Sequence, residues 1–564
     1  MLNETDQFIQ SYKLSDEDID ELIAPTVEEI KGVLGGDWRK TILFLKGTNI
    51  SGRRVAYMDD DYIKAIMIDK RMVNDPFVRS SVYQQIKNRI NEAKVGVLKV
   101  HGNYSIISGD PYLLCQSIFG LKKTGLLKAG EIYNKYWVDY GADKLVCFRA
   151  PMTCHNNIRL VHPSNSESVR YWYRYMNTCT IFNGWDSTTA ALNGADYDGD
   201  IVMLTDNDVL LRCHVPTPTL ICAQRKAEKC VPDEAAFIKS NIDSFGSEIG
   251  QTTNWITSMF EVQAGFNEGS KEYEELNYRI KCGQQAQQDC IDRSKGIICK
   301  PMPRSWHDRH EANRITDNEK RSLYRSIVAD KKPYFMRYIY PDLMKKYNTY
   351  IKNTNRNALR EFRMTIQELL SIQQDELTER QAEFLRYYHY RMPVGMNECV
   401  MNKICKRFES MFDKYIKRYT ASSDFDFGIM KSEYEYTSKQ FNSIKKLYEE
   451  YNRRLKNFVA FAQYERIDDD EAATTYDLLD LEFTEKCNEV CPNRLALCNI
   501  VLDLCYPKSY SKRFAWSMCG SEIIRNLLYS NNGQISYPVK DDTGDVVFCG
   551  ERYGVETREI EVCK

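Results

Sequence analysis

The chain has 564 residues, a formal net charge of −2 and 19 cysteines. A single core rarely grows to that size, so about two to four domains are expected. The near-neutral charge excludes a globally basic nucleic-acid-binding protein, and any such surface must be local. No apolar run reaches the roughly 18 residues that a membrane helix needs. The start, MLNETDQFIQSYKL, is no secretory leader, and the cysteines are scattered, so we expect free thiols in a reducing cytoplasm.

Residue composition and the spacing of apolar residues divide the chain into five segments. Residues 1–94 mix charged helical pattern with short apolar runs. Residues 95–235 carry short β-branched or aromatic runs, VGVLKV, YSIIS, KLVCFRAP, TCTIF and DIVMLT, separated by turn residues, which is typical of strands. Residues 236–305 and 306–470 carry apolar residues at helical spacing, and residues 471–564 are mixed. The sequence therefore predicts an α+β protein with an all-β module and a large, mostly helical C-terminal region.

The stretch 190-AALNGADYDGDIVMLTDN-207 sets Asp196, Asp198 and Asp200 at alternate positions before an apolar run. On an extended strand, residues i and i+4 lie about 13 Å apart. That is too far to share one Mg²⁺, whose ligand oxygens lie at about 2.1 Å. Gly199 gives the backbone the freedom to curl, and a cation removes the repulsion among three convergent carboxylates. The pattern therefore predicts a metal site for Mg²⁺ or Mn²⁺.

Three other interpretations of the aspartates fit the sequence less well than a metal site. A solvated acidic turn needs neither the strict spacing nor the buried strand that follows. A calcium loop needs Gly at its sixth position and Glu at its twelfth, but those positions hold Ile201 and Asn207. A metal-dependent nuclease or phosphatase generally adds a His or Glu ligand, and residues 186–208 contain neither.

The segment NGADYDGD resembles the NADFDGD loop of the β′-type subunit of cellular RNA polymerases. It also resembles the DxDGD loop of single-chain, two-barrel RNA polymerases. The segment 148-FRAPMTCHNNIRL-160 is similar to the RAPTLHR segment that precedes that loop. Residues 95–114 are similar to a strand pair of the single-chain enzymes, matching at Gly109-Asp110. The stretch 95–305 looks most like the phage-encoded single-chain branch and the RNA-dependent RNA polymerase-like proteins.

This resemblance implies a double-psi β-barrel at residues 95–235 as a catalytic core. It implies template-directed nucleotidyl transfer to an RNA 3′ end, with a DNA or RNA template, nucleoside triphosphates as substrates and RNA as product. If a phage encodes the chain, the host cytoplasm is the expected location. The segment 289-DCIDRSKGIICKPMP-303 resembles, more weakly, a polymerase segment at Asp292 and Lys295. The implied site residues are Asp196, Asp198 and Asp200 as catalytic metal ligands, and Arg149 and Lys295 as substrate-binding residues.

The chain departs from this superfamily in one respect. Two-barrel enzymes carry a second barrel, usually N-terminal, with lysines that contact the nucleotide phosphates. Residues 1–94 are too few to hold a complete one. Two alternatives therefore stay open: a partial polymerase that needs a partner polypeptide to supply the second barrel, or a non-catalytic nucleic-acid-binding remnant.

The segment 331–363 has nine Lys or Arg and two Asp or Glu, with aromatic residues between the cations. Cations that pair with phosphates and rings that stack on bases are what single strands bind. We therefore expect Lys345, Lys346 and Lys352 to bind nucleic acid. The alternative is an ordinary helix whose rings point inward.

Four cysteines near the C-terminus fall at spacings that do not match zinc knuckles. They are Cys487, Cys491, Cys498 and Cys505, and the last two belong to the apolar run LALCNIVLDLC. The spacing favours buried thiols on a helix.

Overall fold

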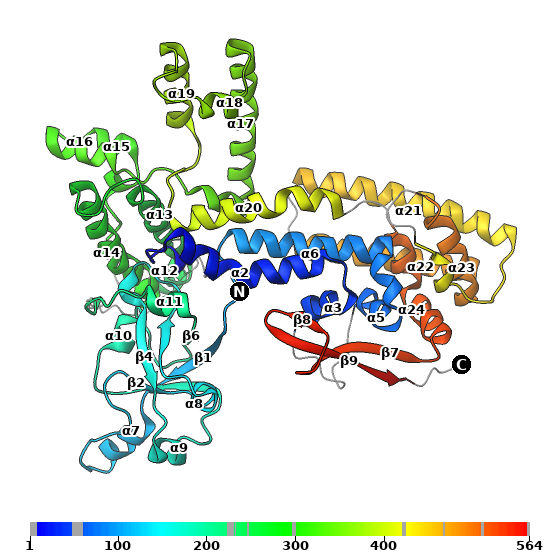
Figure 1. Cartoon of the computed structure of the whole chain (residues 1–564), viewed down its shortest axis with the longest axis horizontal. Helices are drawn as coiled ribbons and strands as arrows, with labels where there is room; N and C mark the ends of the chain where they lie inside the picture. Colours follow the sequence, from blue (N-terminus) through cyan, green and yellow to red (C-terminus); the bar gives the residue numbers. More distant parts are fainter. Residues whose placement is uncertain are drawn as a thin grey trace. The chain divides into compact units, whose positions relative to one another are not determined.

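A computed structural model gives the fold of the chain (Figure 1). Contacts separate two compact units, which are described one at a time: residues 1–24 with 91–411, and residues 25–90 with 412–564. The five segments expected from texture are a finer division and stay a prediction. The structure describes residues 8–47, 60–222, 231, 233–244, 248–295, 300–419, 425–465, 469–508 and 512–560. Of residues 243–244, 294–295, 414–419, 463–465 and 469–471, only the backbone is described.

Six short strands of the first unit close into a barrel in the order β1-β5-β2-β4-β3-β6. The pairs β1/β5 and β2/β4 are parallel, and the other four pairs are antiparallel. Only β3 and β4 are neighbours both in sequence and in the barrel, so the chain interleaves its strands. The strands are β1 (Gly102–Ser108), β2 (Glu131–Tyr133), β3 (Leu145–Phe148), β4 (Arg159–Pro163), β5 (Cys179–Phe182) and β6 (Ile201–Thr205).

This closed barrel beside a large helical region confirms the predicted fold class, α+β with a double-psi β-barrel. Short helices connect the strands, so the module is not purely β. They are α7 (Pro111–Ile118), α8 (Lys135–Tyr140), α9 (Glu167–Trp172), α10 (Thr188–Ala191) and α11 (Asp208–Arg212).

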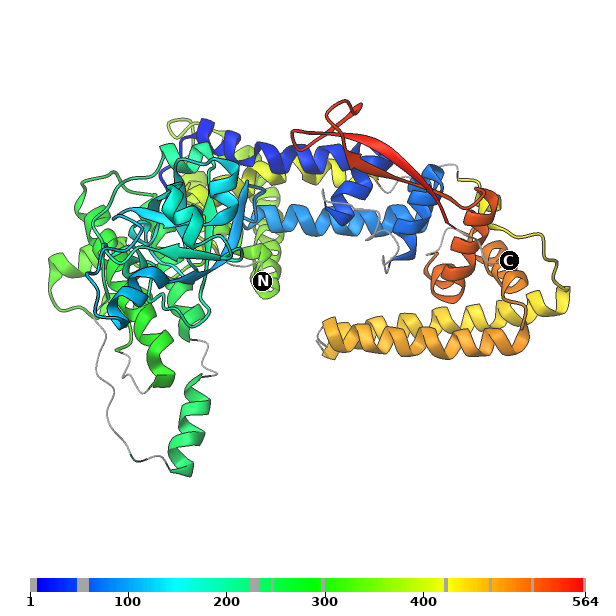
Figure 2. The same cartoon turned by 90° about the horizontal axis from the view of Figure 1, so that it is seen from below.

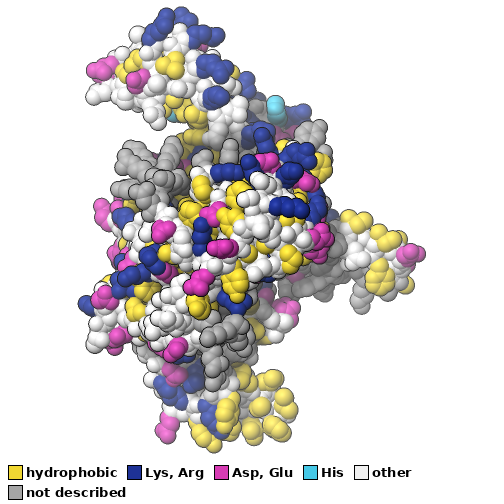
Figure 3. Space-filling model, turned by 90° about the vertical axis from the view of Figure 1, so that its right-hand side faces the viewer, with side chains coloured by type: hydrophobic (Ala, Val, Ile, Leu, Met, Phe, Trp, Pro, Cys, Tyr) yellow, Lys and Arg dark blue, Asp and Glu magenta, His cyan; other side chains and the backbone are white. Residues whose placement is uncertain are grey.

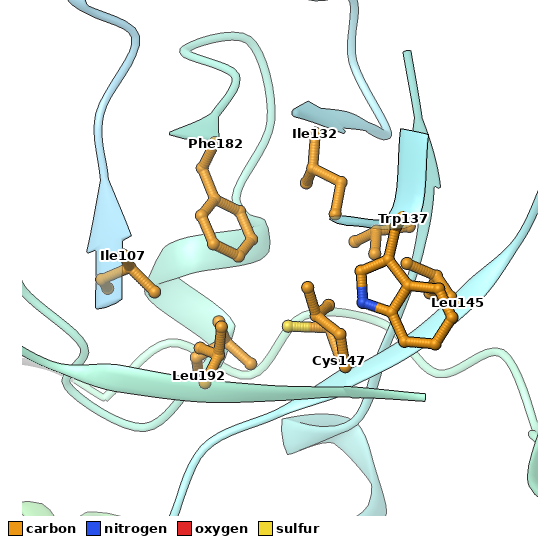
Figure 4. Packing of buried hydrophobic residues seen from close by; sticks show 10 residues of the cluster. Ile107, Ile132, Trp137, Leu145, Cys147, Phe182 and Leu192 are labelled. Carbon is orange, nitrogen blue, oxygen red and sulfur yellow. The ribbon is translucent and has the colours of Figure 1, made fainter. Parts of the chain in front are cut away.

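Apolar side chains from all sides of the barrel fill its interior (Figure 4). Trp137 of α8 is fully buried, and its indole N–H donates to Asn103 Oδ1 at 2.6 Å. On β6, only Ile201 is exposed, while Val202 and Leu204 belong to the core. Strand β6 is therefore anchored immediately after the aspartate loop.

The run VGVLKV does not form a strand, contrary to the sequence interpretation. It follows helix α6 (Pro76–Lys94), and its first residues complete the end of that helix. The Val97 N–H bonds back to Glu92 O at 3.0 Å, and Gly96 has a left-handed φ of +92°. This 6→1 bond with a left-handed residue is a helix-terminating motif, which uses the backbone groups that a strand would need.

Helices make up the rest of the first unit, as the sequence predicted. Helix α13 packs along α14, and α17 rises from the short 3-10 turn Tyr334–Tyr338 (Figure 1). The helices are α12 (Glu234–Ser244), α13 (Glu248–Gln263), α14 (Lys271–Ile291), α15 (Arg309–Asn313), α16 (Asn318–Ser326), α17 (Pro341–Phe362), α18 (Ile366–Ser371) and α19 (Glu379–Arg391). Helices α2 (Asp16–Leu34) and α20 (Val400–Tyr419) belong to it in part, because the boundaries of the units fall within them.

The second unit combines helices with a three-stranded sheet in the order β7-β9-β8. Helices α21 and α22 run side by side as a long antiparallel pair (Figure 2). Cys487, Cys491, Cys498 and Cys505 are fully buried, which confirms their expected burial. The remaining elements are α3 (Trp38–Lys46), α5 (Asp61–Ile68), α21 (Ser438–Glu465), α22 (Asp469–Val490), α23 (Arg494–Cys505), α24 (Arg513–Ser530), β7 (Gln534–Lys540), β8 (Val546–Phe548) and β9 (Glu551–Glu559).

None of the helices in the described ranges combines the length and the apolar composition that crossing a membrane requires.

The anchoring of β6 predicts a local stability effect. Leu204→Ala should lower the free energy of opening of the barrel by about 2–5 kcal/mol, because it leaves a cavity in the core. Hydrogen exchange of the β1 and β6 amides measures this quantity. Tyr104→Ala is the control, since Tyr104 lies on the neighbouring strand and is 66% exposed. Equal exchange in the two variants would contradict a core role for Leu204.

Candidate metal centre

The three aspartates lie on the loop between α10 and β6. One carboxylate oxygen from each of Asp196, Asp198 and Asp200 lies within 4.8 Å of the others. Asp196 and Asp198 are exposed, and Asp200 is half-buried. Among the residues that the structure describes, no other group of three or more His, Cys, Asp or Glu side chains converges in this way.

Backbone conformation makes the loop curl. Asn193, Gly194 and Gly199 have positive φ angles of 50°, 72° and 129°. The Asp196 N–H donates to Asp200 Oδ2 at 2.9 Å, which closes the turn across the motif. Glycine adopts such angles without steric cost, as the sequence predicted for Gly199. The curled loop therefore brings together carboxylates that an extended strand would keep apart.

The convergence suits a hard divalent cation. Carboxylate oxygens are the ligands that Mg²⁺ prefers, at about 2.1 Å in octahedral geometry, which places neighbouring oxygens about 3 to 4 Å apart. The observed separations of up to 4.8 Å are close to that range, and small side-chain rotations remove the difference. The three residues therefore fit a shared Mg²⁺ or Mn²⁺.

Arg149, at the end of β3, lies directly beside the aspartates. Its guanidinium donates to Asp200 Oδ1 at 2.7 Å and to Asn193 O at 2.9 Å. Both side chains of the ion pair are largely buried, Arg149 with 12% and Asp200 with 17% exposed. The structure thus brings Arg149 to the loop, while its expected contact with a nucleotide stays a prediction.

Helix α14 braces the loop from behind. Gln287 Oε1 accepts a hydrogen bond from Asn193 Nδ2 at 2.7 Å, and Gln287 Nε2 donates to Thr253 Oγ1 at 2.6 Å. A Cβ atom on Gly194 would lie 2.1 Å from Gln288 Oε1, so only glycine allows this close approach. The sequence reasoning missed this brace. A signal was present, because the run GQQAQQD places Gln284, Gln287 and Gln288 on one helical face, and all three are buried.

The segment after Arg149 supports the loop from a second side. Asn157 Nδ2 donates to Ala191 O at 2.9 Å, and Pro151 O accepts from Asn193 Nδ2 at 2.9 Å. His155 Nε2 instead accepts from the Val215 N–H at 3.1 Å. Burial lowers the pKa of His155 to about 4, so its ring is neutral at pH 7. Its contacts are structural.

Lys295 ends the short 3-10 helix Asp292–Lys295, but its side chain lies outside the described residues. The start of this helix does contact the brace, because Asp292 Oδ2 accepts from Gln288 Nε2 at 2.8 Å. The role expected for Lys295 therefore stays a prediction.

Lys345, Lys346 and Lys352 are exposed on α17, and their expected role in binding nucleic acid stays a prediction. Two of the rings in the segment, Tyr334 and Phe335, are buried, whereas the others are partly exposed. Arg337 is buried between Tyr334 and Tyr347, with its guanidinium carbon 3.6 and 4.1 Å from the two ring centroids. The rings turn inward because they bury this cation.

Comparisons with known proteins give likenesses in structure but none in sequence. No protein-family profile matches the chain, and no curated protein sequence matches it. Among solved structures, the RNA-dependent RNA polymerase QDE-1 from Thielavia terrestris aligns with a TM-score of 0.41 and 10% sequence identity. The alignment covers 94% of this chain and 56% of that polymerase. An alignment with this TM-score and sequence identity does not indicate a function.

The brace predicts that Gly194→Ala disturbs the metal site, because the added Cβ clashes with Gln288 and φ is left-handed. We expect Mn²⁺ affinity to fall by about 10- to 100-fold, as for losses of supporting contacts around metal ligands. Electron paramagnetic resonance titration of Mn²⁺ measures it. Gly250→Ala in α13 is the control, since no atom lies within 4 Å of its Cβ position. Wild-type affinity in the Gly194 variant would show that the loop does not depend on this contact.

Proposed function

We propose that the chain is a template-directed nucleotidyltransferase that extends RNA, with Mg²⁺ or Mn²⁺ held by Asp196, Asp198 and Asp200. The observation that carries the proposal is the convergence of three carboxylates on a curled, braced loop, within a sequence that resembles the polymerase motif. The barrel supports it, since β6 fixes the loop to a packed core. Such rigidity matters because catalytic groups must stay within about 0.5 Å of their productive positions.

The residues of the loop have distinct proposed roles. A divalent cation bound by the carboxylates supplies Lewis acidity toward a 3′-hydroxyl and a phosphate oxygen. The aspartates hold and orient that charge. Arg149 pairs with Asp200, and its planar guanidinium is suited to bind a triphosphate oxygen as well. Lys295 is proposed as a second cation toward the triphosphate.

The template, the product and the setting belong to the same proposal. We propose a DNA or RNA template strand, nucleoside triphosphates as substrates and an RNA product. The resemblance of residues 95–305 supports a relation to phage-encoded single-chain RNA polymerases, with transcription in the host cytoplasm as the setting.

A partner polypeptide is the second candidate, and one observation favours it. The described residues form a single closed barrel, and their other sheet has only three strands. In that case the chain would bind metal and nucleotide but incorporate none until a lysine-bearing second barrel is added. A metal-dependent nuclease is favoured less, because the convergent group contains three aspartates and no His or Glu.

Replacing one ligand tests the proposal. Asp198→Asn keeps the size of the side chain but removes one charge, so it should abolish incorporation of labelled nucleotides on single-stranded templates and weaken Mn²⁺ binding. Folding should survive, because repulsion between the remaining carboxylates falls. The matched control is Asp208→Asn, an exposed aspartate at the start of α11 outside the convergent group.

The assay separates the candidates by its products. Extension of a primer or of new RNA with Mg²⁺, lost in Asp198→Asn, supports a polymerase. Metal binding without extension supports the need for a partner. Shortening of labelled RNA that depends on Asp198 would replace the proposal with a nuclease, and full activity in Asp198→Asn would remove the aspartates from the site.

The α17 lysines give a further prediction. Replacing Lys345, Lys346 and Lys352 by Gln should weaken single-strand binding and reduce the salt slope by about 2, since each phosphate contact contributes roughly 0.7. Fluorescence anisotropy at several salt concentrations measures both quantities. The control replaces the exposed lysines Lys439, Lys445 and Lys446 of α21 by Gln. The same slope in both triple variants would make the α17 lysines an ordinary solvated face.

A further inference from the structure

The barrel carries an exposed surface rich in rings and cations around α7 and α9. Helix α7, PYLLCQSI, is apolar, yet none of its residues is buried. Figure 3 shows hydrophobic side chains gathered at the bottom of the view, where α7 and α9 lie in Figure 1. We call this surface the aromatic–basic patch; its exposed members are Leu114, Ile118, Phe119, Leu121, Lys122, Lys123, Tyr171, Trp172, Arg174 and Tyr175.

The rings of the patch are held in place, although they face solvent. Tyr171, Trp172 and Tyr175 are 59%, 56% and 78% exposed. The Arg174 guanidinium lies 4.5 Å from the Tyr171 ring centroid and 4.7 Å from that of Tyr175. Tyr112 of α7 lies 5.4 Å from Trp172, centroid to centroid, so the two helices share one surface. The rings therefore form a preformed platform.

Internal hydrogen bonds also fix the loop that carries the two lysines. Gln116 Oε1 accepts from the Thr124 and Gly125 N–H groups at 2.9 Å, and its Nε2 donates to Thr124 Oγ1 at 2.8 Å. Lys122 and Lys123 lie inside the loop that these bonds close, and both are exposed. The two lysines are thus held, exposed to solvent, in a closed loop that follows α7.

The positive charge around α7 favours a negatively charged partner. Residues 111–130 contain three lysines and no Asp or Glu. A second copy of the same patch would repel this one, whereas a polyanion would be attracted. Four exposed aromatic rings with interspersed cations match the way proteins hold single-stranded nucleic acid, by stacking on bases and pairing with phosphates.

The residues just before α7 contact the aspartate motif. Tyr197, inside the aspartate motif, packs against Gly109, because a Cβ on this glycine would lie 3.5 Å from the Tyr197 ring. The next residue, Asp110, caps α7, accepting from the Leu113 N–H at 2.9 Å, and also accepts from Tyr173 OH at 2.6 Å. The start of α7 is therefore fixed next to the aspartate motif.

We propose that the aromatic–basic patch is a binding site for single-stranded nucleic acid, with bases stacked on Tyr171, Trp172 and Tyr175 and phosphates paired with Lys122 and Lys123. Which strand occupies the site, a template or a product, rests on the proposed function. Its binding chemistry needs neither the metal nor nucleotides. It also combines exposed rings with cations, whereas the rings of residues 331–363 are buried or only partly exposed.

Direct binding tests the site. Anisotropy of labelled oligouridylate and oligothymidylate is measured with EDTA and without nucleotides, so the aspartates take no part. Trp172→Ala with Tyr175→Ala should weaken binding by about 5- to 100-fold for each ring, from a stacking energy of roughly 1–3 kcal/mol per base. Trp172→Phe with Tyr175→Phe should restore most of the affinity. Lys122→Gln with Lys123→Gln should lower the salt slope by about 1.4.

The controls separate this site from the polymerase proposal. Tyr529→Ala removes a tyrosine of similar exposure, 65%, from the other unit and should leave binding unchanged. Asp198→Asn should also bind the oligonucleotide normally, so a protein without polymerase activity would still report on the patch. Unchanged affinity in the double alanine variant overturns the proposal. So does a patch-dependent change confined to anionic phosphatidylserine vesicles or to the oligomeric state, since either assigns the surface to a membrane or to a second copy.

Discussion

Repulsion among three convergent carboxylates is the constraint on which the rest of the first unit depends. Two like charges about 4 Å apart near a protein surface repel by on the order of 4 kcal/mol. Two features of the loop reduce this cost: Asp196 and Asp198 remain in water, and Asp200 is paired with Arg149. The remaining negative charge favours a divalent cation. The proposed affinity for metal thus has the same cause as the local instability of the loop, namely the repulsion among carboxylates that the barrel keeps close together.

The loop keeps this arrangement because polar groups, not only apolar packing, position it. Buried amide side chains are costly unless they are hydrogen-bonded. Gln287 meets this requirement by bonding both Asn193 and Thr253, so α13, α14 and the loop share one network. Displacing the loop would leave buried amides unpaired. The helices after the barrel therefore belong to the site as much as its strands do.

Two surfaces of the first unit show why composition alone does not assign a nucleic-acid interface. The α17 segment and the aromatic–basic patch both combine rings with cations in sequence. In the first, Arg337 is buried and the rings close around it, with Glu409 completing the charge balance at 2.8 Å. In the second, the rings and the lysines are all exposed. Burial, which sequence spacing does not report, decides between a core and a binding surface.

The sequence by itself determined the α+β class, the helical region after the barrel, the convergence of Asp196, Asp198 and Asp200 and the need for Gly199 to curl the loop. These features are local, because spacing, turn residues and charge act over a few neighbouring positions. Only the tertiary structure decided which distant groups meet. It turned VGVLKV into a helix end, brought Arg149 to Asp200 and placed the glutamines of α14 behind the loop. Such contacts arise when the interleaved barrel closes, and closure depends on the packing of the whole core rather than on any segment alone.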